Sequence, residues 1–157
     1  ITIGSGVTLQ SNVPAFEAYL SSDQSVSDNV TTKVQVDTEV FDSDDCYDNS
    51  TNYRFTPTKA GKYFVYAKVS CDVNANSAMS QMMTLIYKNG SVYSQSIYNY
   101  ATNFGREGTP YIGTVIDMNG TTDYLELFGQ NDVSSGSATF NGGTQRFTLF
   151  GAYKVGI

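Results

Sequence analysis

The chain has 157 residues, of which 40% are hydrophobic and 15% charged, so it is long enough for one domain with a sizeable core. Its formal net charge is −6 and its 9 Lys and Arg residues do not cluster, which argues against nucleic acid and against anionic membrane surfaces as partners. The absence of histidine excludes a Ser-His or Cys-His nucleophile pair, and no stretch is apolar enough for membrane insertion.

The first twelve residues, ITIGSGVTLQSN, alternate apolar side chains with Gly and Ser. The apolar members are Ile1, Ile3, Val7 and Leu9, and this alternation favours extended β structure. We therefore expect residues 1–12 to form a stalk-like, β-rich connector and residues 13–157 to form a globular head.

Alternation with a period of two recurs through the rest of the chain, and it predicts strands. In KVQVDTEVF the alternating residues are Val34, Val36, Thr38 and Val40. The segment 61–71 places a longer set on one face of a strand, namely Tyr63, Val65, Ala67, Val69 and Cys71. Further strands are predicted in MTLIYK, SVYSQSIY, YIGTVIDM, DYLELFG and RFTLFGAYKV. No window has a helical stripe, so the predicted fold class is all-β.

The connections between these strands differ in length. Asn89-Gly90, Asn119-Gly120 and the segment TPTKAGK are short turns, because their residues accept the backbone angles of tight turns. Long polar connections alternate with them at 21–32, 48–53, 72–80, 99–109 and 129–145. In an up-and-down or jelly-roll barrel, alternate connections lie at opposite ends. We therefore expect the tight turns to gather at one end and the long loops at the other.

The same alternation separates the two cysteines. Cys46 is expected near the end with the tight turns and Cys71 near the end with the long loops. A disulfide needs Cα atoms within about 7 Å, so the sequence predicts two unpaired and mostly buried thiols.

Four aspartates surround Cys46, at positions 42, 44, 45 and 48. Such a group is either a set of metal ligands or the polar ends of two strands. The consecutive calcium-loop pattern is missing, and aspartate is a preferred turn residue because its carboxylate accepts bonds from nearby backbone amides. We interpret the group as turn residues. No cofactor and no metal site are predicted, although a structural calcium ion is conceivable.

The segment CYDNSTNYRFTPTKAGKYFV resembles the signature of the complement C-one-q globular head, part of the tumour-necrosis-factor-like jelly-roll superfamily. The matching residues are Phe41, Tyr47, Asp48, Thr51, Phe55, Thr56, Gly61, Tyr63 and Val65. Phe16, Ala18 and Tyr19 are similar to the first strand of that family, and TLFGAYKV with Gly151 to its last. The resemblance implies a ten-stranded antiparallel jelly-roll sandwich without catalytic activity that assembles as a homotrimer. Aromatic and apolar strand residues beyond the needs of one small core support assembly, for example Tyr63, Phe147, Leu149 and Tyr153.

The first twelve residues resemble the β-rich stalk segments of marine bacteriophage tail fibres. The leading hypothesis is therefore a receptor-binding head at the tip of a trimeric phage fibre or virion appendage, located on the virion surface. Its partner would be a bacterial cell-surface glycan or protein. One alternative is a secreted, lectin-like defence protein, which the Asn-x-Ser/Thr sequons superficially support. Another is a structural virion decoration protein. Glycosidase activity through Glu107 and Asp132 is the weakest interpretation.

The predicted binding residues lie in two long loops. Aromatic rings stack on sugars, while Asn, Asp, Arg and Glu form directional hydrogen bonds. The set consists of Tyr98, Tyr100, Asn103, Phe104, Arg106 and Glu107 from the first loop, with Asn131, Asp132, Phe140 and Asn141 from the second. The alternative is that Tyr98 and Phe104 anchor the loop to the core.

Overall fold

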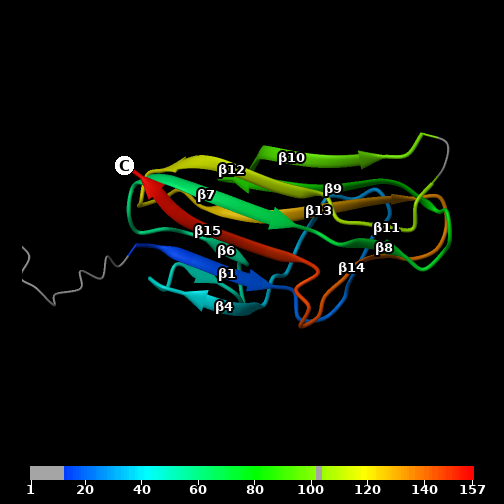
Figure 1. The fold of residues 1–157 in the computed structure, drawn as a ribbon, viewed down its shortest axis with the longest axis horizontal. Helices are drawn as coiled ribbons and strands as arrows, with labels where there is room; N and C mark the ends of the chain where they lie inside the picture. Colours follow the sequence, from blue (N-terminus) through cyan, green and yellow to red (C-terminus); the bar gives the residue numbers. More distant parts are fainter. Residues whose placement is uncertain (1–12, 102–103) are drawn as a thin grey trace, which may run out of the picture.

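The computed structural model describes residues 13–101 and 104–157, and its secondary structure is all-β (Figure 1). The predicted connector at 1–12 lies outside the described residues. The strands are β1 (Ala15–Tyr19), β2 (Gln24–Val26), β3 (Thr32–Lys33), β4 (Thr38–Asp42), β5 (Tyr47–Asp48), β6 (Arg54–Phe55), β7 (Gly61–Lys68), β8 (Cys71–Val73), β9 (Met79–Lys88), β10 (Ser91–Asn99), β11 (Glu107–Gly108), β12 (Tyr111–Met118), β13 (Leu125–Val133), β14 (Ala138–Phe140) and β15 (Leu149–Gly156).

Two main sheets form the jelly roll, and all strand pairs are antiparallel. One sheet has the order β12-β7-β15-β1-β4, and the other has the order β10-β9-β13-β6-β5, with β3 also paired to β13. A third, smaller sheet has the order β11-β8-β14-β2. Along the chain, β11 comes directly before β12, β8 directly after β7, β14 directly before β15, and β2 directly after β1. The order of the four strands in the small sheet is therefore the same as the order of their neighbours in the first main sheet. The small sheet therefore continues the first main sheet past a break in each strand.

This break explains most of the error in the predicted strand number. The described residues contain fifteen strands rather than ten. Val69 and Ser70 separate β7 from β8, and Pro110 lies between β11 and β12. The predicted strand at 33–41 is also divided. Val34 and Val36 are buried as expected, but β4 begins only at Thr38. The alternation identified the strands without showing where each one bends.

The core lies between the two main sheets and is built on aromatic rings. The ring of Phe16 stacks on Tyr47 and Phe55, with centroid distances of 4.4 and 4.7 Å, and meets the ring of Phe150 edge-on. Tyr63 is also fully buried, and its hydroxyl donates to the carbonyl of Lys59. Tyr63 is thus a core residue and not part of a surplus for assembly, which corrects the prediction. Four positions of the sequence signature, Tyr47, Phe55, Tyr63 and Val65, are explained by this packing.

The tight turns gather at one end, which we call the turn end and define by residues 59–60, 89–90 and 119–124. A Cβ at Gly120 would lie 2.2 Å from the amide nitrogen of Ala60, so two of the turns are in contact. The turn at 89–90 is hydrogen-bonded to the turn at 119–124, because the amide of Asn89 donates to the carbonyl of Tyr124. The C-terminus lies at the same end (Figure 1).

The long connections gather at the other end, which we call the loop end and define by residues 27–31, 74–78, 104–107 and 134–137. Backbone hydrogen bonds tie these segments together, from Asn29 to Asn131, from Ser134 to Ala78 and from Val73 to Arg106. The predicted division into two ends is confirmed for these four connections. The fifth, at 48–53, is not part of the loop end and lies beside β3, where Lys33 donates to the carbonyl of Asn52. The loops are shorter than expected, because β8, β11 and β14 occupy parts of them.

Asp42 and Asp48 fasten turns in the way the sequence predicted. The carboxylate of Asp42 accepts bonds from the amides of Asp44, Cys46 and Tyr47. The carboxylate of Asp48 accepts bonds from the amides of residues 50, 51 and 52. These two aspartates are turn residues.

Both cysteines are free and buried, as the alternation of connections predicted. The thiol of Cys46 donates to Asp42 at 3.2 Å, beside the hairpin of β5 and β6. Cys71 belongs to the small sheet, where it pairs with Phe140 of β14 and Gly108 of β11. Within the described residues no helix has the length and apolar character needed to cross a membrane.

Candidate functional site

The loop end carries the first candidate surface, and Tyr98 is its most exposed predicted aromatic residue. Tyr98 lies near the end of β10 and has 42% of its surface exposed. Its ring lies against Gly108, where a Cβ would be 3.3 Å from a ring carbon. Tyr98 therefore offers an exposed ring face with a fixed backbone behind it.

The neighbouring aromatics of the same loop are less accessible. Tyr100 packs against the core, and its amide donates to the carbonyl of Ser80. A Cβ at Gly105 would be 3.2 Å from the ring of Tyr100, so the glycine allows the loop to close over this ring. Phe104 is half-buried. Tyr100 is thus an anchor, and the predicted residue Asn103 lies outside the described residues.

Arg106 and Glu107 are exposed and stand beside a carboxylate that the sequence analysis did not single out. Arg106 Nε lies 3.5 Å from the carboxylate of Asp72, and Glu107 is directly opposite Asp72 between β11 and β8. Thr139 and Ser25 continue the same row across β14 and β2. The outer face of the small sheet is therefore a polar row of two hydroxyls and two carboxylates. The sequence contains one indication of this polar row. In both CDV and ATF a single polar residue stands between two residues that are buried in the structure.

Two predicted site residues, Asn131 and Phe140, are fully buried and do not reach the surface. The expected loop at 129–145 contains the end of β13 and all of β14, so alternate residues face inward. The ring of Phe140 lies over Gly129, where a Cβ would be 2.6 Å away. The amide group of Asn131 donates to the carbonyls of Asp72 and Thr139 and so joins the small sheet to β13. Both residues are structural.

The last two predicted residues, Asp132 and Asn141, are half-buried. The carbonyl of Asp132 accepts a bond from the hydroxyl of Ser80. Asn141 is held at the break between β14 and β15, where its amide donates to the carbonyl of Ser70. Within residues 13–101 and 104–157 there is no group of three or more Asp, Glu, Cys or His side chains suited to hold a metal ion.

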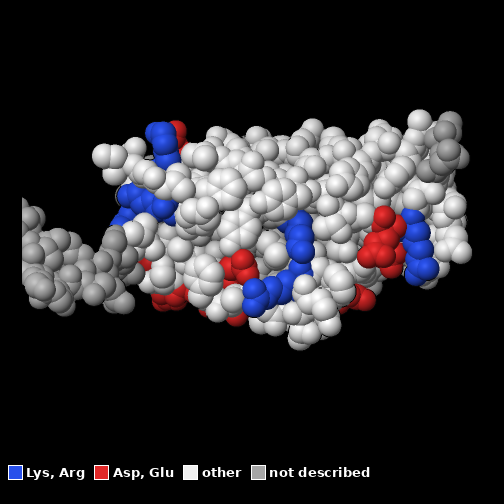
Figure 2. Space-filling view, viewed as in Figure 1, with Lys and Arg blue, Asp and Glu red and all other residues white. Residues whose placement is uncertain are grey.

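A second candidate surface is the outer face of the sheet β12-β7-β15-β1-β4. Large apolar and aromatic side chains are exposed on it, with Tyr111 at 55%, Val115 at 48%, Tyr153 at 46% and Val155 at 51%. Tyr153 also contacts Phe64 and Tyr66 in one aromatic cluster. In Figure 2 the charged side chains form a few separate groups on an otherwise uncharged face. We call this surface the apolar face.

One polar network crosses the apolar face. The hydroxyl of Tyr66 donates to one oxygen of Glu17 at 2.8 Å, and Arg146 donates to the other oxygen at 2.8 Å. Burial raises the pKa of Tyr66 well above its ordinary value, and the bond to Glu17 adds to the effect. The ring of Tyr66 covers Gly151, where a Cβ would lie 2.3 Å from a ring atom. A glycine in β15 is therefore required for this arrangement.

Beside the apolar face, β10 forms the edge of the second main sheet and contacts β12. Apart from Tyr98 at the loop end, its exposed apolar residues are Val92, Tyr93 and Ile97. The protein thus has two different apolar surfaces, a sheet face and a sheet edge.

The comparisons with known proteins concern the fold. No family model matches the sequence, and no curated protein matches it. Among solved structures, murine APRIL is similar with a TM-score of 0.63, 12% identity and coverage of 91% of this chain and 99% of that chain. Eiger TNF from S. frugiperda is similar with a TM-score of 0.59, 9% identity and coverage of 91% of both chains.

The globular domain of zebrafish complement 1qA protein is similar with a TM-score of 0.60, 11% identity and coverage of 91% of this chain and 97% of that chain. Each of these likenesses covers 91% of this chain. The chain has the jelly-roll fold of tumour-necrosis-factor-like and complement C-one-q globular domains.

Proposed function

We propose that the protein is a non-catalytic binding head that works as a homotrimer and presents its loop end to a receptor. The observation that carries the proposal is the apolar face. Monomeric proteins seldom expose a continuous set of large apolar side chains, and such a surface marks an interaction site. A second copy of the chain is the proposed occupant, because the molecule also has the apolar edge of β10 to place on it.

The difference between the two apolar surfaces determines the type of assembly. A face that packs on a different surface of the next copy makes a head-to-tail contact, which closes into a ring when the rotation allows it. The jelly roll of tumour-necrosis-factor-like domains implies a ring of three. Burial of the apolar face would then stabilise the trimer by roughly 25 cal/mol per Å² of apolar area.

Two valines with equal exposure test this assembly. Val115 on the apolar face is 48% exposed, and Val30 at the loop end is 49% exposed. Val115→Asp places a charge in the proposed contact and is expected to yield monomers, whereas Val30→Asp should remain trimeric. Light scattering and circular dichroism measure mass and folding together. A folded, trimeric Val115→Asp variant would contradict the placement of the interface.

The proposed receptor is a bacterial cell-surface glycan or protein, and the proposed setting is a phage tail fibre or another virion appendage. Tyr98, Arg106 and Glu107 are the exposed residues that support a site at the loop end. The hydrogen bonds between the loops support it further, because a preorganised surface loses less conformational entropy on binding. Three copies per head would multiply weak affinities.

An array of bacterial surface glycans, probed with the labelled trimer, tests the receptor site. The double variant Tyr98→Ala, Arg106→Ala is expected to lose the glycans that the unmodified trimer retains. Lys62→Ala is the control, because it removes a cation from the strand that begins at the turn end. Retention of the same glycans by the folded, trimeric double variant would exclude these residues from the site.

A further inference from the structure

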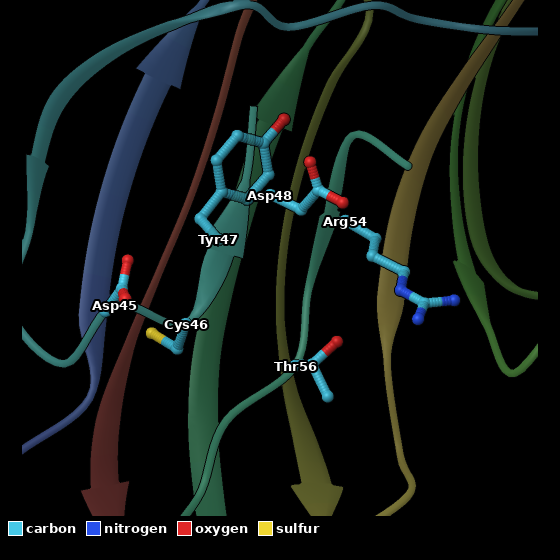
Figure 3. Close-up of a pocket in the computed structure, with 6 residues that line it drawn as sticks. All are labelled: Asp45, Cys46, Tyr47, Asp48, Arg54 and Thr56. Atoms are coloured by element: carbon cyan, nitrogen blue, oxygen red, sulfur yellow. The ribbon is translucent and has the colours of Figure 1, made fainter. Parts of the chain in front are cut away.

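A pocket of about 360 Å³ lies beside the hairpin of β5 and β6, and its lining residues belong neither to the loop end nor to the apolar face (Figure 3). It is lined by Asp45, Cys46, Tyr47, Asp48, Arg54 and Thr56. Its volume is at the low end of the range for small-molecule sites, which begins near about 300 Å³. The pocket therefore matches a single small ligand.

The pairing of β5 with β6 determines which side chains face the pocket. Tyr47 is opposite Phe55, and both point into the core. Because side chains alternate along a strand, Asp48 and Arg54, which are also opposite each other, point outward. The amide of Thr56 donates to the carbonyl of Cys46 and extends the same ladder by one step. One face of this short hairpin is the floor of the pocket.

Arg54 is unusual because it does not pair with the aspartate opposite it. The carboxylate of Asp48 is occupied by the amides of the following turn and by the side chain of Asn52. The guanidinium of Arg54 instead lies over the ring of Tyr124, at 4.8 Å from the centroid. In the described part of this acidic chain, Arg54 is the one arginine without an ion pair. Its position is fixed by stacking while its donors stay available.

Two more polar side chains at the pocket are available to a ligand. Within residues 13–101 and 104–157, neither the carboxylate of Asp45 nor the hydroxyl of Thr56 has a hydrogen-bond partner. Figure 3 shows Asp45 and Arg54 on opposite sides of the pocket, with Thr56 on a third side. The pocket thus combines an acceptor, a group of donors and a hydroxyl that serves as either.

The charges at the pocket decide between ligand classes. Two carboxylates and one guanidinium give a net charge of −1, which disfavours an anion. A neutral ligand with several hydroxyls satisfies the acceptor and the donors together. We propose that this pocket binds one neutral sugar residue, with Arg54 donating to its oxygens and Asp45 accepting from a hydroxyl. This site is separate from the proposed receptor surface and does not depend on it.

Nuclear magnetic resonance titration of the full chain with the methyl glycosides of glucose, galactose and mannose tests the proposal. The expected result is saturable shifts of the Arg54 Nε–H and of the amides of Cys46 and Thr56, with a dissociation constant on the order of 1 mM for at least one glycoside. Arg54→Lys and Thr56→Val, which keep the approximate size of each side chain, are each expected to weaken binding by roughly fivefold to tenfold. Lys62→Arg, which keeps an exposed cation in β7, is the control and should bind as the unmodified chain does.

Three results would overturn the proposal. The first is the absence of saturable shifts at the pocket for all three glycosides up to ten times that concentration. The second is shifts confined to the loop end, which would support the receptor surface instead. The third is binding at the pocket of the methylammonium ion but of no glycoside, because it would assign the site to cations.

Discussion

Asp48 shows how one side chain organises the segment that follows β5. Hydrogen bonds from the amide of Thr51, with those from Ser50 and Asn52, hold the pKa of Asp48 well below its ordinary value of 3.8. A carboxyl group whose pKa is lower in the folded state than in the unfolded state stabilises the folded state at pH values above the unfolded pKa. The contribution is lost as the pH falls through the folded pKa.

We therefore expect Asp48→Asn to lower the free energy of unfolding at pH 7 by about 1 kcal/mol, because the charge-assisted bonds are weakened. The dependence of stability on pH below about 4 should also become shallower. Asp45→Asn is the control, since Asp45 is exposed and asparagine accepts its positive φ of 51°. Urea unfolding between pH 2 and 7 measures both effects. Equal pH dependence in the Asp48 variant and the unmodified chain would contradict the assignment.

The two thiols give a second prediction at this scale. Burial raises the pKa of Cys46 and of Cys71 well above the ordinary value for a thiol, and the bond to Asp42 adds to the effect at Cys46. Because the thiolate is the reactive form, neither residue should react with a thiol reagent in the native protein. Two thiols per chain should react after denaturation without a reductant. Detection of none would show that the two residues are paired.

At the scale of elements, β15 depends on a glycine below the aromatic cluster. Gly151→Ala would place a Cβ 2.3 Å from the ring of Tyr66, so the ring must leave its position beside Glu17. Overpacking of this kind costs about 1–3 kcal/mol. Gly156→Ala in the same strand is the control, because its Cβ would have 3.9 Å to the nearest atom. Thermal unfolding of both variants compares them, and equal melting temperatures would contradict the steric argument.

The sequence predicted these elements to different degrees. The alternation in segment 61–71 was sufficient to identify its buried face, since Tyr63, Val65, Ala67, Val69 and Cys71 are all buried. The lengths of the connections predicted the two ends of the molecule, because turn chemistry is local. Phe140 was misassigned because it lies in a strand of three residues inside a polar segment, and Asn131 because the polar end of the long strand β13 was interpreted as part of a loop. The apolar face depends on contacts between strands far apart in sequence, which no local pattern identifies. The pocket is lined by the single segment 45–56, whose aspartates the sequence identified as turn residues without indicating a cavity.

At the scale of the whole molecule, the central claim is that the jelly roll assembles through its apolar face and the edge of β10. Burial of the exposed aromatic and apolar side chains against another copy would remove them from water. A trimer also places three loop ends in one particle, which is the basis of the proposed receptor binding.

Light scattering of the unmodified protein at micromolar concentration tests this claim most directly. We expect a mass of three times 17.1 kDa that does not change over a tenfold dilution. A stable particle of 17.1 kDa under the same conditions would contradict it.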